Sequence, residues 1–277
     1  MIVLLVILIL YLFCICPALR RHPYARVMKE QKLFAHRGLF DNAGISPENS
    51  MPAFQKAVEA GFGIETDIQL TKDGIPVLHH DFACKRTLRD RENRPVKGKI
   101  SDYTYEELMQ FHIINSEEKV PALSEFLETV DGKVPLILEY KIEESDRDCS
   151  VCAVSEKLLA AYHGQYCIES FNPRGVLWYR KNRPDIMRGQ LSDAFYHKRH
   201  CSFIHFLCAM LCFNFLTKPD FIAYDVKYAG NVSRLLCHGL YRNTAVCWTV
   251  RSEQQLVYAE KHFDVIIFDS FLPDKSA

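Results

Sequence analysis

Eight short runs rich in aliphatic, β-branched and aromatic residues alternate with helical patterns along most of this chain. The runs expected to form strands are 32–36, 63–70, 135–140, 166–171, 186–190, 221–226, 245–250 and 265–269. Strands that alternate with helices build a parallel sheet, because each helix returns the chain to the starting edge. Eight such units in a domain of about 250 residues predict a TIM barrel, an α/β fold. In that fold, polar residues at the carboxyl ends of the strands carry the chemistry.

Two segments depart from this alternation. The run 75–80 follows the second strand after only four residues, 71–74, which is too short for a parallel crossover. Asp73-Gly74 suits a tight turn, because glycine accepts positive φ, so we expect a hairpin extension beside the barrel mouth. The stretch 82–132 is longer than an ordinary barrel loop. We expect it to form a small inserted subdomain within a barrel domain of residues 32–277.

The first nineteen residues contain no charged side chain and are almost continuously apolar. That length is close to what crosses a hydrocarbon core of about 30 Å, so residues 1–19 are expected to form a transmembrane anchor. Arg20, Arg21 and Arg26 follow in a basic linker, 20–31, while no basic residue precedes the run. The positive-inside rule therefore predicts a single-pass protein of the cell membrane with a cytoplasmic catalytic domain. A cleaved signal peptide, the competing interpretation, normally has a basic region first and a small-residue cleavage site afterwards.

A second apolar stretch, 203–216, follows the fifth expected strand. Its fourteen residues are too few to span a bilayer. Because it leaves the carboxyl end of a strand, it is expected on the same face as the catalytic residues. Either a buried helix or an interfacial segment that dips into lipid fits this pattern, and Lys198, Arg199 and Lys218 flank it.

Charge and motif content exclude several function classes. The chain has 34 basic and 34 acidic residues, so no field of one sign would attract nucleic acid. Its eleven cysteines form one CxxC pair, Cys149 and Cys152, and lack the second pair that a zinc site would use. An odd cysteine count with several in apolar runs favours reduced, buried thiols. The glycine-rich dinucleotide motif, the nucleotide P-loop and the serine-hydrolase elbow are all absent.

Three carboxylates are expected to meet at the barrel mouth. Glu65 and Asp67 lie two residues apart on the second strand, so both point to one face. Glu139 lies near the end of the third strand and supplies a third inward carboxylate. Like charges in a low-dielectric site are costly unless a cation lies between them. Hard oxygen ligands favour one divalent cation, Mg²⁺ or Ca²⁺.

Cationic and imidazole side chains are expected beside these carboxylates. His36 and Arg37 stand at the end of the first strand, and Lys141 follows Glu139 by two residues. His79 and His80 end the hairpin extension, and strand alternation allows one of them to face the mouth without saying which. Cations that neutralise nonbridging oxygens and imidazoles that transfer protons suit phosphoryl chemistry.

The order and spacing of these residues resemble the glycerophosphodiester phosphodiesterase family, as a membrane-anchored, bacterial-like member. The similar motifs are His36-Arg37-Gly38, Pro47-Glu48-Asn49-Ser50, Glu65-x-Asp67, Thr71-Lys72-Asp73-Gly74, His80-Asp81, Pro121-Ala122-Leu123-Ser124-Glu125, Glu139-Tyr140-Lys141, Ser170-Phe171 and Trp248-Thr249-Val250. Together they extend over nearly all of the chain after residue 31.

The resemblance implies hydrolysis of glycerophosphodiesters to sn-glycerol 3-phosphate and an alcohol. It implies that His36 and His80, rather than His79, form the general acid and base pair. The divalent cation would be held by Glu65, Asp67 and Glu139, and the phosphate would contact Arg37 and Lys141. Trp248, at a strand end, is interpreted as part of the glycerol pocket.

Two departures from the family pattern bear on the substrate. Arg251 follows Trp248-Thr249-Val250 where the family usually has Asn, and Phe268-Asp269-Ser270 replaces a typical Thr-Asp pair. One alternative therefore keeps the site but cleaves membrane lysolipids, in the manner of a lysophospholipase D. A second alternative is a noncatalytic, membrane-tethered module that binds phosphodiesters, against which the intact histidines and carboxylates argue.

Overall fold

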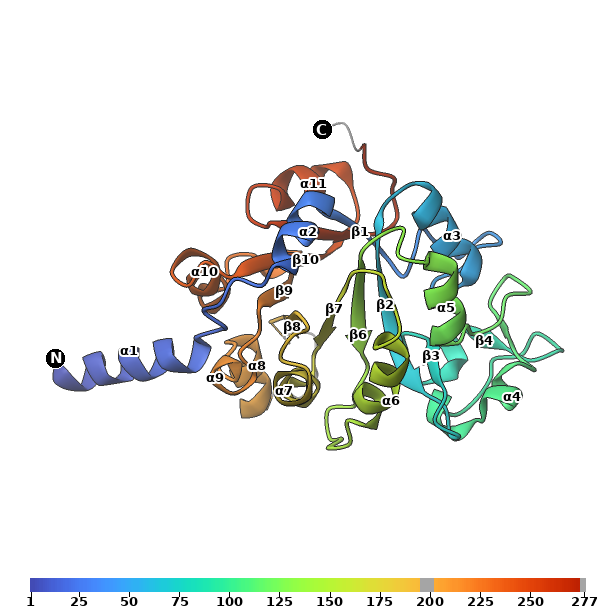
Figure 1. The fold of residues 1–277 in the computed structure, drawn as a ribbon, viewed down its shortest axis with the longest axis horizontal. Helices are drawn as coiled ribbons and strands as arrows, with labels where there is room; N and C mark the ends of the chain where they lie inside the picture. The colour runs from blue at the N-terminus through green and yellow to red at the C-terminus, as the bar shows by residue number, and fades with distance from the viewer. Residues whose placement is uncertain (195–201, 275–277) are drawn as a thin grey trace.

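Eight parallel strands close into a barrel in the computed structural model, which describes residues 1–194 and 202–274 (Figure 1). Strand β1 pairs with both β11 and β2, which closes the sheet on itself. The barrel strands are β1 Leu33–His36, β2 Gly63–Leu70, β6 Leu136–Tyr140, β7 Tyr166–Ser170, β8 Arg188–Ser192, β9 Phe221–Asp225, β10 Thr244–Val250 and β11 Val265–Phe268. This confirms the predicted TIM barrel, although β8 begins two residues later than expected.

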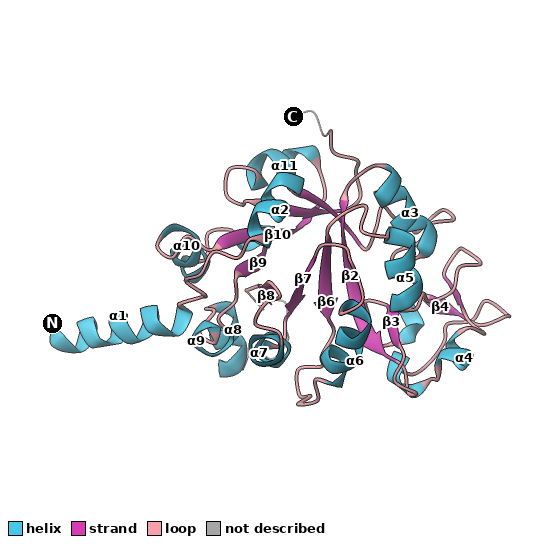
Figure 2. Cartoon of the chain, in the orientation of Figure 1, coloured by secondary structure: helices cyan, strands magenta, loops and turns pink. Residues whose placement is uncertain are grey.

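Helices surround this barrel, as Figure 2 shows. They are α2 Tyr24–Gln31, α3 Met51–Glu59, α5 Leu123–Val130, α6 Ser150–Leu159, α7 Pro173–Asn182, α8 Phe203–Ala209, α9 Asn214–Thr217, α10 Val232–Gly239 and α11 Glu253–Ala259. The segment expected as a basic linker, 20–31, thus contains helix α2. Tyr24 and Met28 of α2 are buried among residues of the barrel interior, and Tyr24 donates a hydrogen bond to the backbone oxygen of Leu136, 3.1 Å away. Helix α2 therefore closes the amino end of the barrel.

Large and small residues complement each other inside the barrel. A Cβ atom built on Gly63 of β2 would lie 2.5 Å from Cδ1 of Phe34 on the neighbouring strand β1. Likewise, a Cβ on Gly189 of β8 would lie 2.2 Å from the ring of Phe221 on β9. The two phenylalanine rings thus occupy the space that a longer side chain at either glycine would need.

The hairpin extension forms as expected, since β3 Pro76–Leu78 pairs antiparallel with β2. Beyond it, helix α4 Tyr105–Leu108 and the short pair β4 Leu88–Arg89 and β5 His112–Ile113 belong to the insertion. The insertion and β3 share a second cluster of buried apolar residues: Val77, Cys84, Leu88, Val96, Ile100, Leu108, Ile113 and Val120. Helix α5, in contrast, packs on α3, where the rings of Phe54 and Phe126 lie 4.5 Å apart. The compact insertion thus ends before α5, about ten residues before the expected boundary at 132.

His79 is buried where the insertion meets the barrel. Its Nδ1 lies 2.7 Å from the backbone oxygen of Asp81, which only accepts, so Nδ1 carries the proton. Its Nε2 lies 2.7 Å from Oγ1 of Thr87 and accepts from that hydroxyl. Burial lowers the pKa of His79 to about 4, so the ring is neutral near pH 7, and the neutral ring makes both contacts.

The N-terminal apolar segment forms helix α1, Ile2–Ile15, which is 14 residues long and projects from the barrel (Figure 1). Among the described residues, no helix is both long and apolar enough to cross a membrane. The expected transmembrane span over 1–19 is therefore not supported. Its second half belongs to the domain, because Tyr241 donates to the backbone oxygen of Leu12 at 2.8 Å and Asn214 donates to that of Ile15 at 2.9 Å.

The second apolar stretch, 203–216, folds into α8 and the start of α9. It is neither wholly buried nor wholly exposed. Ala209, Leu211 and Asn214 are buried, whereas Phe203 and Phe206 are 74% and 54% exposed. The expected flanking residues Lys198 and Arg199 lie outside the described residues.

We expect Gly63→Ala to lower the free energy of unfolding by about 1–3 kcal/mol, because the added methyl group would overpack the barrel interior against Phe34. Gly239→Ala is the matched control. No atom lies within 4 Å of a Cβ added at Gly239 in α10, so this change should be neutral or slightly stabilising. Urea denaturation of both variants measures the difference. Equal stabilities of the two variants would contradict this packing argument.

We expect the free energy of unfolding to fall more steeply in the wild type than in His79→Gln as the pH is lowered from about 6.5 to about 4. In the unfolded chain, His79 is protonated over most of that interval. In the native state it stays neutral until the pH approaches its pKa of about 4. The slopes should differ by at most about 1.4 kcal/mol per pH unit, the value for one proton. Denaturation at several pH values checks this, and parallel curves would show that His79 does not titrate differently in the native state.

Candidate active site

Three buried carboxylates converge at the carboxyl end of the barrel. Glu65 and Asp67 come from β2, and Glu139 comes from the adjacent strand β6, where it is the register partner of Asp67. One oxygen from each of the three lies within 4.8 Å of the others. Strand alternation explains this meeting, because all three side chains point into the barrel.

The charges of these carboxylates are only partly balanced. Burial, followed by repulsion from Asp67, raises the pKa of Glu65 well above its usual range. Burial also raises the pKa of Glu139, although Lys141 opposes the shift. Burial alone would raise the pKa of Asp67, but His80, Lys141 and Arg37 together lower it. Oδ1 of Asp67 is enclosed without a hydrogen-bond partner among the described residues. A hard divalent cation fits this donor set, because it would satisfy that oxygen and relieve the repulsion.

Two cationic side chains line the same site. Nζ of Lys141 lies 2.9 Å from Oε1 of Glu139 and 3.4 Å from Oδ1 of Asp67. Nε of Arg37 lies 3.4 Å from Oδ2 of Asp67 and has no hydrogen-bond partner among the described residues. Both side chains are nearly buried, so their charges act in a low-dielectric setting. They can therefore hold an anionic phosphate beside the carboxylates.

Glu48 positions Arg37 and connects the insertion to the site. Its Oε1 accepts from Nη1 of Arg37 at 2.9 Å, and its Oε2 accepts from Nη1 of Arg86 at 2.9 Å. Burial would raise the pKa of Glu48, but Arg86 and Arg37 lower it to about 2. The motif containing Glu48 was recognised from the sequence, whereas Arg86 was missed. Its position in the insertion, five residues after Asp81, was the available signal.

His36 is held by a carboxylate from the last strand of the barrel. Its Nδ1 lies 2.7 Å from Oδ2 of Asp269, so Nδ1 donates, and in the neutral ring Nε2 then carries no proton. That Nε2 lies 4.0 Å from Oε2 of Glu65. Burial, followed by the charge of Arg37, lowers the pKa of His36 to about 4. Asp269 also pairs with Arg251, where Nε lies 3.0 Å from Oδ1. The sequence drew attention to both residues only as departures from the family pattern.

His80 and His79 face different surroundings. Nδ1 of His80 lies 2.6 Å from Oδ1 of Asp81, and about a third of its side chain is exposed. Its interaction with Asp67 contributes to the lowered pKa of that carboxyl, and its interaction with Glu139 opposes the rise in the pKa of that residue. His79 bonds instead to Thr87 in the insertion. His80 thus interacts electrostatically with the carboxylates of the barrel mouth, whereas His79 bonds into the insertion.

Aromatic side chains lie on another part of the barrel mouth. Trp248 of β10 and Phe171, which follows β7, contact edge to face with ring centroids 5.4 Å apart. Nε1 of Trp248 is enclosed and has no hydrogen-bond partner among the described residues. Trp248 was expected in a substrate pocket. Its partner Phe171 was noted only as part of the Ser170-Phe171 motif.

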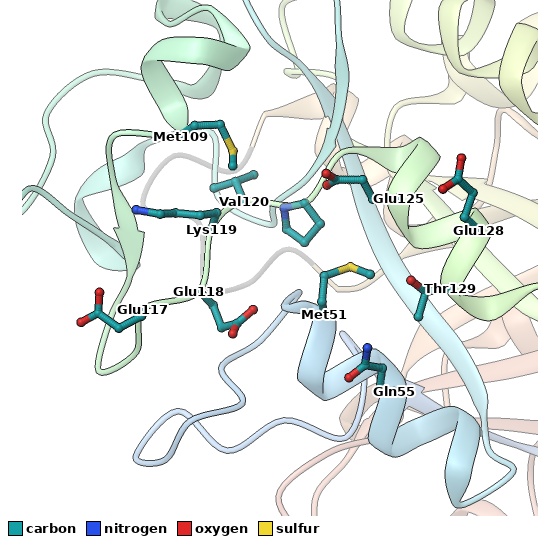
Figure 3. Close-up of a pocket in the computed structure, with 11 residues that line it drawn as sticks. Met51, Gln55, Met109, Glu117, Glu118, Lys119, Val120, Glu125, Glu128 and Thr129 are labelled. Atoms are coloured by element: carbon teal, nitrogen blue, oxygen red, sulfur yellow. The ribbon is translucent and has the colours of Figure 1, made fainter.

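A separate groove of about 540 Å³ lies between the insertion and helices α3 and α5 (Figure 3). Several glutamates and one lysine line it, together with Met51 and Met109. None of the carboxylates, histidines and cations described above belongs to its lining. The catalytic candidates are therefore grouped at the barrel mouth, away from this groove.

Solved structures similar to this chain share its fold. A phosphodiesterase from Oleispira antarctica in complex with the product sn-glycerol-3-phosphate aligns with a TM-score of 0.67 over 86% of this chain and 92% of that one, at 23% identity. A putative glycerophosphoryl diester phosphodiesterase from Silicibacter pomeroyi aligns with a TM-score of 0.68 over 91% and 92%, at 20% identity.

Sequence relatives carry related names. A glycerophosphodiester phosphodiesterase from Bacillus altitudinis is 38% identical over 121 residues, which are 41% of this chain and 46% of that protein. One from Caldanaerobacter subterraneus is 32% identical over 57% of this chain and 65% of that protein. The matches thus span about half to two thirds of these relatives. The profile of the glycerophosphoryl diester phosphodiesterase family matches residues 36–271, which include every catalytic candidate described above, and the chain therefore belongs to that family.

Proposed function

We propose that this protein hydrolyses glycerophosphodiesters to sn-glycerol 3-phosphate and an alcohol. One observation carries the proposal. Two imidazoles, His36 and His80, each bonded through Nδ1 to a carboxylate, lie beside three buried carboxylates and two cations at the barrel mouth. The similar phosphodiesterase from Oleispira antarctica, which was solved with sn-glycerol-3-phosphate, supports this substrate class.

Glu65, Asp67 and Glu139 would hold one divalent cation, Mg²⁺ or Ca²⁺. Such an ion, when bound, neutralises charge on the nonbridging phosphate oxygens. Arg37 and Lys141, which flank the carboxylates, add positive charge and orient the phosphate. This arrangement stabilises the extra negative charge that develops as the phosphoester bond breaks.

The histidines move the protons. Their Nδ1 atoms are occupied by Asp269 and Asp81, which leaves the two Nε2 atoms for the substrate. One Nε2 would take the proton of the attacking hydroxyl or water, and the other would protonate the leaving alcohol oxygen. Asp269 and Asp81 act as positioning residues, because each fixes the tautomer and orientation of its imidazole.

The aromatic pair provides an apolar wall for the organic part of the substrate. In the order of the barrel strands, β11 alone separates β10, which carries Trp248, from β1, and β6 alone separates β7, which precedes Phe171, from β2. Carbon-bound hydrogens of a glycerol group can pack on such rings, and Nε1 of Trp248 can donate to a hydroxyl. These two rings would therefore determine the orientation in which the glycerol group binds.

A lysophospholipase D activity at the same site is the second candidate, and the exposed apolar surface favours it. The side chains of residues 2–10 in α1 are between 49% and 77% exposed, and none is polar. Further exposed apolar residues lie on the neighbouring helices: Phe203, Ile204 and Phe206 on α8, Leu216 on α9, and Val232 and Leu235 on α10. We call α1 and these side chains the apolar side of the barrel.

The elements of the apolar side contact one another. The ring of Phe13 lies 5.6 Å from that of Phe215, and Oη of Tyr11 lies 2.7 Å from Oγ of Ser233 on α10. Asn231 donates to the backbone oxygen of Ala209 at 3.3 Å, which joins α10 to α8. Ser192 at the end of β8 donates to the backbone oxygen of Cys208 at 2.9 Å, and Tyr224 of β9 donates to that of Ala209 at 2.9 Å, so α8 brings this surface to the catalytic face. We propose that it lies on the cytoplasmic face of the cell membrane and gives lipid phosphodiesters access to the site.

The noncatalytic alternative has less support. A module that only binds phosphodiesters would need cations, which Arg37 and Lys141 supply. It would not need two histidines oriented by carboxylates, and it would gain nothing from the buried acidic residues that repel its ligand.

We expect His36→Ala and His80→Ala each to lower kcat for glycerophosphocholine by about 10² to 10⁴, because each variant loses one proton-transfer group. His79→Gln is the matched control and should retain most of the activity. Choline release in the presence of Mg²⁺ or Ca²⁺ measures the rates, and chelation of the cation should abolish them. Near-normal turnover in either alanine variant would remove the proposed mechanism, and lack of turnover by the wild type on several glycerophosphodiesters would remove the proposed function.

We expect the double variant Phe203→Ser and Phe206→Ser, combined with deletion of residues 2–10, to lose at least about tenfold in affinity for vesicles that contain anionic lipid. The reason is the loss of apolar area that the bilayer would cover. Val257→Ser is the control, because Val257 is similarly exposed on α11, outside the apolar side. Vesicle co-sedimentation measures binding. Turnover of vesicle-bound lysophosphatidylcholine should fall, whereas turnover of soluble glycerophosphocholine should not, and unchanged vesicle binding would refute the membrane proposal.

A further inference from the structure

A fourth buried glutamate stands beside the three carboxylates of the candidate cation site. Glu169 lies on β7 and is the register partner of Glu139 on β6, so the two side chains point to the same face of the sheet. It is 1% exposed. Its Oε2 is enclosed and has no hydrogen-bond partner among the described residues. The motifs that identify the family do not include this residue.

An ionised Glu169 in this buried position costs free energy. A buried carboxylate is normally compensated by a hydrogen bond or by an opposite charge. The nearest cation, Lys141, already pairs with Glu139 and Asp67. Burial, followed by the charges of Glu139 and Asp67, raises the pKa of Glu169 well above its usual range. The surrounding residues thus favour the protonated form of Glu169, and an ionised Glu169 needs a positive charge or a hydrogen-bond donor that the described part of the polypeptide does not supply.

The chemistry of the cation identifies what that could be. Mg²⁺ takes six oxygen ligands and Ca²⁺ takes six to eight, and three carboxylates that each offer one oxygen leave at least three positions to other ligands. Water and substrate provide the rest, and a metal-bound water needs a hydrogen-bond acceptor. Oε2 of Glu169 is such an acceptor, buried beside Glu139 and without a competing partner.

We infer that Glu169 belongs to the cation site as a positioning residue, and that it raises the affinity for the divalent cation by accepting a hydrogen bond from one of its water ligands. This inference rests on the proposed function, because it takes Glu65, Asp67 and Glu139 as the direct ligands. The competing interpretation is a neutral glutamic acid that fills space in the barrel. In that case, cation affinity would not depend on Glu169.

The test is calorimetric titration of the metal-free protein with Mg²⁺ alone and with Ca²⁺ alone. Glu169→Gln keeps the shape of the side chain and removes its charge. We expect the Kd of the cation that the wild type binds to rise about tenfold or more, the range found when outer partners of metal ligands are removed. The metal-free variant should melt at the same temperature as the wild type or higher, because it no longer buries an uncompensated carboxylate. The increase in melting temperature on cation addition should shrink.

Two control variants separate the possible outcomes. Glu156→Gln removes another buried glutamate, on α6 outside the barrel, which pairs with Arg183, and it should leave the Kd unchanged. Glu65→Gln removes a proposed direct ligand and should abolish binding. If Glu169→Gln changes the Kd less than threefold while Glu65→Gln abolishes binding, the inference fails and the proposed function stands. If the wild type binds neither cation and hydrolyses no glycerophosphodiester, the proposed function itself fails.

Discussion

The repulsion among Glu65, Asp67 and Glu139 is the interaction around which the rest of the site is arranged. A folded protein does not bring three carboxylates within 4.8 Å in a buried place without compensation. Part of that compensation is visible, because Lys141 and Arg37 lie against Asp67. In our interpretation, a divalent cation supplies the rest of the positive charge, and the phosphate of the substrate then binds to that cation and to the two cationic side chains. In this interpretation, the site is built for charges that arrive with the substrate and the cation.

The insertion contributes directly to this arrangement. Arg86 joins Glu48 to Asp81, and those two carboxylates in turn hold Arg37 and His80. One chain of ion pairs thus connects the end of β1, the hairpin extension and the inserted subdomain. In our proposal Arg37 contacts the phosphate and His80 transfers a proton, so the same arginine positions both groups. A change at Arg86 would consequently disturb two catalytic roles without touching the substrate.

The sequence was sufficient for the barrel and for the residues at the strand ends, because period and spacing are local properties. All eight strands were recognised, and the carboxylates two apart on β2 followed from alternation. Long-range pairing was not accessible. The contact between His36 and Asp269 joins the first and last strands of the barrel, and only closure of the sheet brings them together. Glu169 was overlooked for a similar reason, since its importance depends on the register of β7 against β6.

The N-terminal segment shows that hydropathy alone does not predict what an apolar segment packs against. An uncharged run of nineteen residues predicted a membrane span, but hydropathy cannot show that Leu12 and Ile15 already bond to side chains of the barrel domain. Likewise, the insertion boundary failed at α5, whose apolar residues could have packed on either the insertion or the barrel. For both α1 and α5, the sequence pattern correctly indicated an apolar face, but it did not determine which part of the protein that face contacts.

Helix α2 closes the amino end of the barrel with Tyr24 and Met28, and this has a consequence for turnover. In the proposed reaction, substrate and both products pass through the opposite end, where α8 bonds to the end of β8 and exposes Phe203 and Phe206. The substrate then enters, and both products leave, through the same barrel mouth. A water-soluble product leaves through it readily, whereas a lipid product has to return to the surface from which its precursor came. The order in which the two products depart would then be set by their solubility as much as by their contacts in the site.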